Sequence, residues 1–198
     1  PVALTATAST DNLIQIYVEY SQQVDETTAE TVGNYKLSSG EIDNVVLQDD
    51  GLTAVITLKA AKAQQDTVKL TIKNVKDAAG TVIADTIIEG IEFFDITPPE
   101  IVDVAVVGKD TFKVTFSEPM AESDKANFVV NGGKLYVKSV TRQNNDTEML
   151  VKMYSSFQEG DITLLVKSSN EDFAEFGVKA ETFTLTVVKD TEAPEVIG

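Results

Sequence analysis

The residues of this chain that could do chemistry are acidic. The sequence contains 32 Asp and Glu residues against 16 Lys and Arg residues, and it has no His and no Cys. Without imidazole or thiolate groups, Ser-His-Asp catalysis, Cys-His catalysis and the usual zinc ligand sets are excluded. Two kinds of carboxylate chemistry remain: paired-acid catalysis, as in glycoside hydrolysis, and coordination of a hard cation such as Ca²⁺.

Paired-acid catalysis is the less favoured of the two. It requires two carboxyl groups that face a deep groove. Glu118 with Glu122, and Glu171 with Glu175, have the right residue type, but both pairs lie in segments that the sequence predicts to be exposed loops. Loop carboxylates are usually solvated. We therefore do not expect the chain to be an enzyme.

Asp95, Glu118 and Asp172 are the candidate ligands for a cation. Ca²⁺ accepts about six to eight oxygen ligands and tolerates irregular geometry, so carboxylates on separate loops suit it. No EF-hand spacing is present, and the three acids can share an ion only if the fold brings them together. The alternative is that they are solvated surface groups.

The sequence repeats with a long period. Residues 95–102 (DITPPEIV) return as residues 190–197 (DTEAPEVI), an offset of 95 residues, and residues 66–73 match residues 161–167. A unit of this length can hold its own hydrophobic core. We therefore expect two tandem domains, at residues 1–95 and 96–189. Residues 190–198 would be the start of a linker to a further repeat.

Both halves show the alternation of apolar and polar residues that indicates half-buried strands. Phe112, Val114 and Phe116, for example, alternate with Lys113 and Thr115. The expected strands are residues 4–8, 14–20, 34–38, 41–47, 53–58, 68–73 and 86–94 in the first half, and 101–107, 112–116, 127–131, 134–141, 148–153, 162–166 and 182–188 in the second. This pattern predicts an all-β fold of two immunoglobulin-like β-sandwiches, each of about seven strands, arranged end to end.

Helix is expected only between the second and third strands of each half. In the first half, residues 27–30 (TTAE) offer a capping-box pattern, and in the second half residues 122–126 are expected to form a turn of helix. The predicted core positions are Val18, Tyr20, Ile56, Leu58, Leu70 and Ile72 in the first domain, and Val114, Phe116, Val151, Met153, Leu164 and Val166 in the second.

The predicted topology would gather the candidate ligands at one pole of the second domain. In a seven-strand sandwich, the start of the first strand, the end of the second, and the loop between the sixth and seventh share a pole. These segments are residues 95–100, 117–122 and 168–177, and they hold no compensating basic cluster. We therefore expect a calcium site near the joint between the domains. Its ligands would be Asp95, Glu118 and Asp172, with Glu171 and Glu175 as alternatives to Asp172 and with Glu122 nearby.

Three segments resemble a known family. Residues 114–120 (VTFSEPM), the turn at residues 75–82 (VKDAAGTV) and the linker at residues 190–194 (DTEAP) are similar to the tandem bacterial Ig-like domains of surface-layer and related cell-wall-associated proteins. The resemblance covers essentially the whole chain, twice. Two departures stand out: residues 21–24 (SQQV) replace Ser-Glu-Pro followed by an apolar residue, and residues 170–177 (NEDFAEFG) replace the Asp-x-x-Gly turn.

The resemblance implies a structural role outside a bacterial cell, at its surface or wall, as rod, spacer and lattice-contact modules. The implied partners are other copies of the same array, and cell-wall glycan would be bound through parts of the parent protein outside these residues. Two alternatives stay open: an adhesive or carbohydrate-binding module, and spacer domains of a secreted polysaccharide-degrading enzyme. The aromatic residues available to a carbohydrate module are Tyr17, Tyr136, Tyr154, Phe157, Phe173 and Phe176.

Charge and hydropathy narrow the partners further. The formal net charge of −16 repels phosphate backbones and anionic lipid, so nucleic acid is not expected as a partner. No segment approaches the roughly 20 apolar residues that cross a bilayer, so membrane insertion is not expected either. The absence of Cys fits a reducing compartment, and it equally fits a bacterial surface protein built without disulfides.

Overall fold

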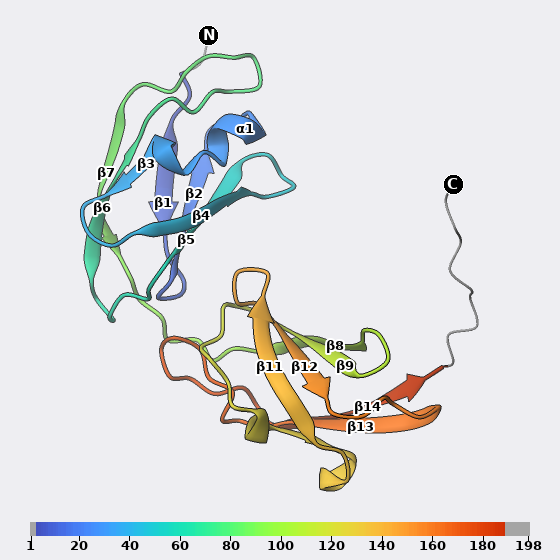
Figure 1. Ribbon diagram of the computed structural model, residues 1–198. Coiled ribbons are helices and arrows are strands. Elements are labelled where there is room, and N and C mark those ends of the chain that lie inside the picture. Colours follow the sequence, from blue (N-terminus) through green and yellow to red (C-terminus); the bar gives the residue numbers. More distant parts are fainter. Residues whose placement is uncertain (1–2, 189–198) are drawn as a thin grey trace, which may run out of the picture. The chain divides into compact units, whose positions relative to one another are not determined.

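The computed structural model describes residues 3–188 (Figure 1). The chain divides into two compact units, Pro1–Thr97 and Pro98–Gly198. The linker predicted at residues 190–198 lies outside the described residues. In the described part of the chain, no helix is long and apolar enough to cross a membrane.

The described part of the first unit forms two antiparallel sheets. Its strands are β1 (Ala6–Ser9), β2 (Gln15–Tyr20), β3 (Tyr35–Leu37), β4 (Ile42–Leu47), β5 (Thr53–Leu58), β6 (Thr67–Ile72) and β7 (Thr86–Glu92). A four-stranded sheet has the order β1-β2-β5-β4, and a three-stranded sheet has the order β3-β6-β7. This division of seven strands is that of a constant-type immunoglobulin sandwich.

The second unit has the same strand order. Its strands are β8 (Ile101–Val106), β9 (Thr111–Phe116), β10 (Phe128–Val130), β11 (Val137–Gln143), β12 (Glu148–Met153), β13 (Gly160–Val166) and β14 (Glu181–Val187). They form the sheets β8-β9-β12-β11 and β10-β13-β14. The predicted fold class of two Ig-like β-sandwiches is therefore confirmed, and the end-to-end arrangement stays a prediction.

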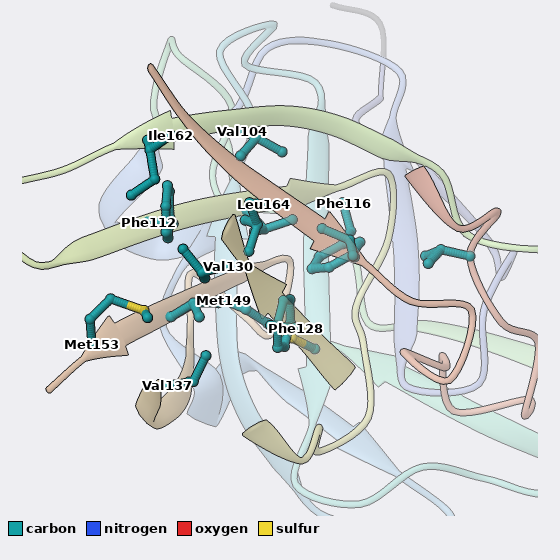
Figure 2. Packing of buried hydrophobic residues seen from close by; sticks show 14 of the residues in the cluster. Val104, Phe112, Phe116, Phe128, Val130, Val137, Met149, Met153, Ile162 and Leu164 are labelled. Carbon is teal, nitrogen blue, oxygen red and sulfur yellow. The ribbon is translucent and has the colours of Figure 1, made fainter. Parts of the chain in front are cut away.

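Each unit buries the apolar face of both its sheets. Figure 2 shows this core in the second unit, where Phe112, Phe116, Met149 and Leu164 lie among side chains from the two sheets. All twelve core positions predicted from the alternation are buried, each 3% exposed or less. Because successive side chains of a strand point to opposite faces, the alternating pattern alone determines which of them face the core.

Short helices lie where the sequence predicts them, but they begin at other residues. Helix α1 (Glu26–Ala29) is capped by Asp25, whose side chain accepts a hydrogen bond from the Thr28 N–H at 2.9 Å. Glu30 does not complete a capping box, because its Oε1 accepts from the Leu47 N–H at 2.9 Å. In the second unit, a 3₁₀ helix forms at Lys125–Asn127.

Strand β11 begins later than predicted. A strand was expected over residues 134–141, but residues 131–133 form a 3₁₀ turn and the strand runs from Val137 to Gln143. Asn131, Gly132 and Gly133 have left-handed φ angles of 47°, 64° and 88°, and Lys134, where the strand was predicted to begin, still has the helical angles φ −78° and ψ −20° at the end of this turn. The chain therefore needs more residues to pass from one sheet to the other than the sequence pattern indicated.

Candidate functional site

Glu118 is positioned by the end of strand β9. The strand ends at Phe116, and the next residue is bonded to the segment that enters β8. The Ser117 N–H donates to the Glu100 carbonyl at 3.0 Å, and the Glu100 N–H donates to Ser117 Oγ at 2.9 Å. Glu118 follows directly, and it is half-buried.

Asp172 lies in a tight loop between β13 and β14. Its Oδ1 accepts hydrogen bonds from the Ala174 N–H at 2.7 Å and the Phe176 N–H at 2.9 Å. Its own N–H donates to the Phe176 carbonyl at 3.0 Å. The side chain is buried, with 2% of the residue exposed. These bonds hold the carboxylate in one orientation, which is what a binding site requires of its ligands.

One contact closes this loop on itself, and another holds it against the segment that follows β9. Gly177 packs so closely on Ser168 that a Cβ at this position would lie 2.0 Å from the Ser168 carbonyl oxygen, so the loop can close only with glycine here. Met120 forms an antiparallel bridge with Asp172. As a result, Glu118 and Asp172 have carboxylate oxygens within 4.8 Å of one another. The structure therefore brings these two predicted ligands together within the second unit.

Asp95, the third predicted ligand, belongs to the first unit. Its N–H donates to Gln64 Oε1 at 3.0 Å, and its carbonyl accepts from the Gln64 side-chain amide, so its backbone is clamped to the loop between β5 and β6. Its Oδ1 accepts from the Thr97 N–H at 3.1 Å. These bonds hold the linker residue in place relative to the first unit. Coordination of a cation by the three acids stays a prediction.

Arg142 on strand β11 is the charged residue at this pole that the sequence interpretation missed. Its Nη1 donates to the Met120 carbonyl at 2.9 Å and lies 3.0 Å from Asp146 Oδ2, and its Nη2 lies 3.7 Å from Glu122 Oε1. The guanidinium also lies 5.8 Å from the centre of the Phe173 ring. The prediction considered only loop residues at this pole, whereas the positively charged Arg142 lies on a strand. The signal available was the spacing of four residues between Arg142 and Asp146.

The acids flanking the predicted ligands are less suited to hold an ion. Glu122, with a side chain 91% exposed, pairs with Arg142, and Glu171 and Glu175 are exposed. An exposed carboxylate loses more side-chain freedom and more hydration on binding a cation than one already held in place. Glu118 and Asp172 are therefore the better placed pair.

The Asp172 loop has a counterpart in the first unit, which corrects one reading of the sequence. Asp77 Oδ1 accepts from the Ala79 N–H at 2.9 Å and the Thr81 N–H at 2.8 Å, the same pattern as in the Asp172 loop. The turn therefore persists in the second unit, with Glu175 at φ 67° where the first unit has Gly80 at φ 88°. The sequence suggested that the Asp-x-x-Gly turn is replaced in the second unit because its glycine is absent there.

Two bacterial cell-surface proteins are similar in sequence to this chain over nearly its whole length. No family model matches the chain. The surface-layer 125 kDa protein of Lysinibacillus sphaericus is 36% identical over 203 residues, which cover 98% of this chain and 17% of that protein. An outer cell wall protein of Brevibacillus brevis is 29% identical over 188 residues, which cover 95% of this chain and 18% of that protein. The chain thus spans less than a fifth of the length of either relative.

Among solved structures, the N-terminal part of the bacterial S-layer protein SbsC superposes with a TM-score of 0.45 at 14% identity, covering 90% of this chain and 44% of that chain. The sequence relatives of this chain are thus a bacterial surface-layer protein and a bacterial outer cell wall protein, and both are similar to it over nearly its whole length.

Proposed function

We propose that this chain is a structural part of a bacterial surface layer, in which its two Ig-like sandwiches act as rod, spacer and lattice-contact modules outside the cell. The observation that carries the proposal is the 36% identity to a surface-layer protein over 98% of the chain. The matched region is 17% of that relative, so the layer would be built by a larger parent protein. The partners would then be other copies of the same array.

The energetics of the fold support this role. Each unit encloses a core of its own, and in the second unit this core includes three fully or almost fully buried aromatic side chains, Phe112, Phe116 and Phe128. Burial of such side chains is the main favourable term in folding, so each unit can be stable without disulfides. Modules that fold independently can be strung in a row without changing one another.

We also infer that the chain has no catalytic role. It lacks the His and Cys side chains on which most nucleophilic catalysis depends, and its relatives are named as layer and wall proteins. The acids that remain have a simpler use as cation ligands or as solvated surface charge.

The location of the parent protein tests the structural proposal. Antibodies raised against this chain should label the outer surface of intact producing cells, and the parent reading frame should encode further Ig-like copies and a wall-anchoring segment. Label restricted to the cell interior, or a catalytic domain in the same reading frame, would contradict the proposal.

We further propose that Asp95, Glu118 and Asp172 bind Ca²⁺. Within the second unit, the carboxylates of Glu118 and Asp172 lie close enough to share an ion, and Asp172 is held rigidly by its loop. Asp95 is tethered to the same pole by the chain, because the segment from Asp95 to Glu100 spans at most about 17 Å when extended. Two neighbouring carboxylates repel each other, and a divalent cation would remove this repulsion.

Calorimetry and thermal unfolding with and without Ca²⁺ test this site. A dissociation constant of about 10⁻⁴ to 10⁻³ M, typical of extracellular calcium modules, would stabilise the chain by about 1 to 2 kcal/mol in about 5 mM Ca²⁺. Asp95→Asn together with Glu118→Gln should remove this gain. The matched control Glu122→Gln removes an exposed acid of the same pole and should preserve it. Absence of binding heat, together with a melting curve that Ca²⁺ does not change, would exclude the site.

A further inference from the structure

A mostly apolar groove lies on the second unit between the edge strands of its two sheets. Strand β10 is the edge of one sheet and β11 is the edge of the other. The groove between them has a volume of about 510 Å³, and its lining includes Phe128, Leu135, Tyr136 and Tyr154. Tyr136 and Tyr154 are 75% and 65% exposed. Two large aromatic side chains thus lie in water at the margin of an apolar groove.

The first unit shows that the fold does not need these tyrosines. The Tyr154 N–H donates to the Tyr136 carbonyl in the second unit, and the Lys59 N–H donates to the Glu41 carbonyl at 3.0 Å at the corresponding place in the first. Glu41 and Lys59 there form an exposed ion pair at 2.8 Å. The two residues joined by this backbone hydrogen bond therefore form an ion pair in the first unit and are two exposed tyrosines in the second. Exposed tyrosines without a role in folding are typical of interaction surfaces, where Tyr is enriched.

Lysines border the groove, in a chain whose net charge is −16. The segment along it contains Lys125, Lys134 and Lys138, and the last two directly adjoin the lining residues Leu135 and Val137. Among residues 3–188, no carboxylate forms an ion pair with any of these three lysines, whereas Arg142 is paired with Asp146. Lys125 itself lines the groove. This surface is complementary in charge to an acidic protein.

We propose that this tyrosine groove, formed by Phe128, Leu135, Tyr136 and Tyr154 with the flanking lysines, docks an acidic surface of a second copy of this chain. The inference rests on the proposed function, in which neighbouring molecules are copies of one another. The acidic surface of a neighbouring copy would then lie against each groove and complement the charge of its lysines. Such a contact joins two different surfaces, so it leaves a groove and an acidic surface unused at the two ends and can extend into an array.

Sedimentation velocity of the 198-residue chain tests the contact. The wild type should associate in a concentration-dependent manner, and a rise in salt from about 50 to about 500 mM should weaken the association because it screens the charges. Tyr136→Glu with Tyr154→Lys places the first unit's ion pair at the same backbone positions, so the fold should persist. This variant should associate at least about tenfold more weakly, as expected for the loss of two aromatic contacts.

A matched control makes the same kind of change outside the groove. Ile87→Glu with Val102→Lys replaces two exposed apolar side chains, 60% and 63% exposed, by one acid and one base. It should associate like the wild type. The reverse graft in the first unit, Glu41→Tyr with Lys59→Tyr, tests whether a tyrosine pair alone is sufficient. It should not restore association to the groove variant, because Ser39 and Asp43 there take the places of Lys134 and Lys138.

Three results would overturn the docking proposal. The first is a wild-type chain that stays monomeric at millimolar concentration, and the second is a groove variant that associates as strongly as the wild type. The third is a shift of the Tyr136 and Tyr154 NMR signals on addition of N-acetylglucosamine oligosaccharides without self-association, which would assign the groove to carbohydrate. None of these results would move the parent protein from the cell surface, so failure of the groove and failure of the proposed function can be told apart.

Discussion

The two units share a strand order but solve the packing between their second and third strands differently. In the first unit, Tyr20 and Tyr35 are buried with their hydroxyl groups 2.7 Å apart, and the Tyr35 hydroxyl donates to the Ala29 carbonyl at 2.6 Å. The corresponding residues of the second unit are Phe116 and Phe128, at the end of β9 and the start of β10. The first unit therefore has a series of hydrogen bonds from tyrosine hydroxyl groups at the place where the second unit has phenylalanine side chains, which cannot form them.

This difference follows from what each connection must satisfy. Helix α1 ends at Ala29, and the carbonyl groups of a last helical turn lack partners within the helix. The Tyr35 hydroxyl, which lies in the core, is the hydrogen-bond partner of one of these groups, the Ala29 carbonyl. In the second unit, the corresponding connection contains a 3₁₀ helix at Lys125–Asn127, and phenylalanines are sufficient there. A comparison of two copies of one fold thus separates the residues that build the fold from those that serve a local need.

The largest effect we expect comes from truncation of a core side chain in one unit. Phe116→Ala should lower the free energy of unfolding of the second unit by about 3 to 5 kcal/mol, because Phe116 is 3% exposed and the cavity left behind would not close fully. The first unit should be unchanged, because its core is separate. Hydrogen exchange read by mass spectrometry follows the two units individually. A loss within experimental error, or an equal loss in both units, would contradict the assignment of separate cores.

The tyrosine pair should make the first unit more sensitive to alkali than the second. Burial raises the pKa of Tyr35 to about 12 and also raises the pKa of Tyr20. The unfolded chain releases these protons near pH 10, whereas the folded unit retains them, so the stabilisation is complete below pH 10 and declines as the pH rises toward 12. Tyr35 alone should account for about 2 to 3 kcal/mol of this decline.

Chemical unfolding of both units between pH 9 and pH 12 measures the effect, with the second unit as an internal reference. Tyr20→Phe with Tyr35→Phe, the pair found in the second unit, should remove the additional decline. The variant should lose about 1 kcal/mol at neutral pH, because the Ala29 carbonyl would lose its partner. A parallel decline of the two wild-type units would show that the tyrosines are not the cause.

The smallest expected effect concerns the corresponding turns at Gly80 and Glu175. Both residues have positive φ angles, and this conformation costs a residue with a side chain about 1 kcal/mol more than glycine. Glu175→Gly should therefore stabilise the second unit by about 1 kcal/mol, and Gly80→Ala should destabilise the first by a similar amount. Thermal unfolding measures both changes. Destabilisation by Glu175→Gly would indicate that the glutamate side chain makes a contact worth more than the strain.

Much of the fold could be predicted because strands with one buried face carry a period of two residues in the sequence. This period predicted the buried faces of β9 and β12 through Phe116 and Met153, which are both buried. It could not predict where β11 begins, because the turn that ends at Lys134 depends on how far the chain must travel between two sheets. The alternation of apolar and polar residues carries no information about the distance between the two sheets.

The candidate site was predictable in part. The topology of an Ig-like sandwich placed Glu118 and Asp172 at one pole, and they lie together there. Arg142 was missed because it comes from the neighbouring strand β11 and reaches Asp146 and Glu122 across the pole. The groove at Tyr136 and Tyr154 could not be predicted, because the sequence pattern does not show how the edge strands β10 and β11 of the two sheets lie next to each other.

The sequence by itself determined the all-β class, the strand faces and the acidic character of the surface, because burial periodicity and charge are properties of residue order and composition. Only the tertiary structure decided which side chains meet across strands that are distant in the sequence. It assigned Arg142 to the acidic pole, showed that Glu175 takes the place of a glycine, and left Tyr136 and Tyr154 exposed where the first unit has an ion pair. Such pairings depend on register and on the path of each connection, and these are settled only when both sheets pack around one core.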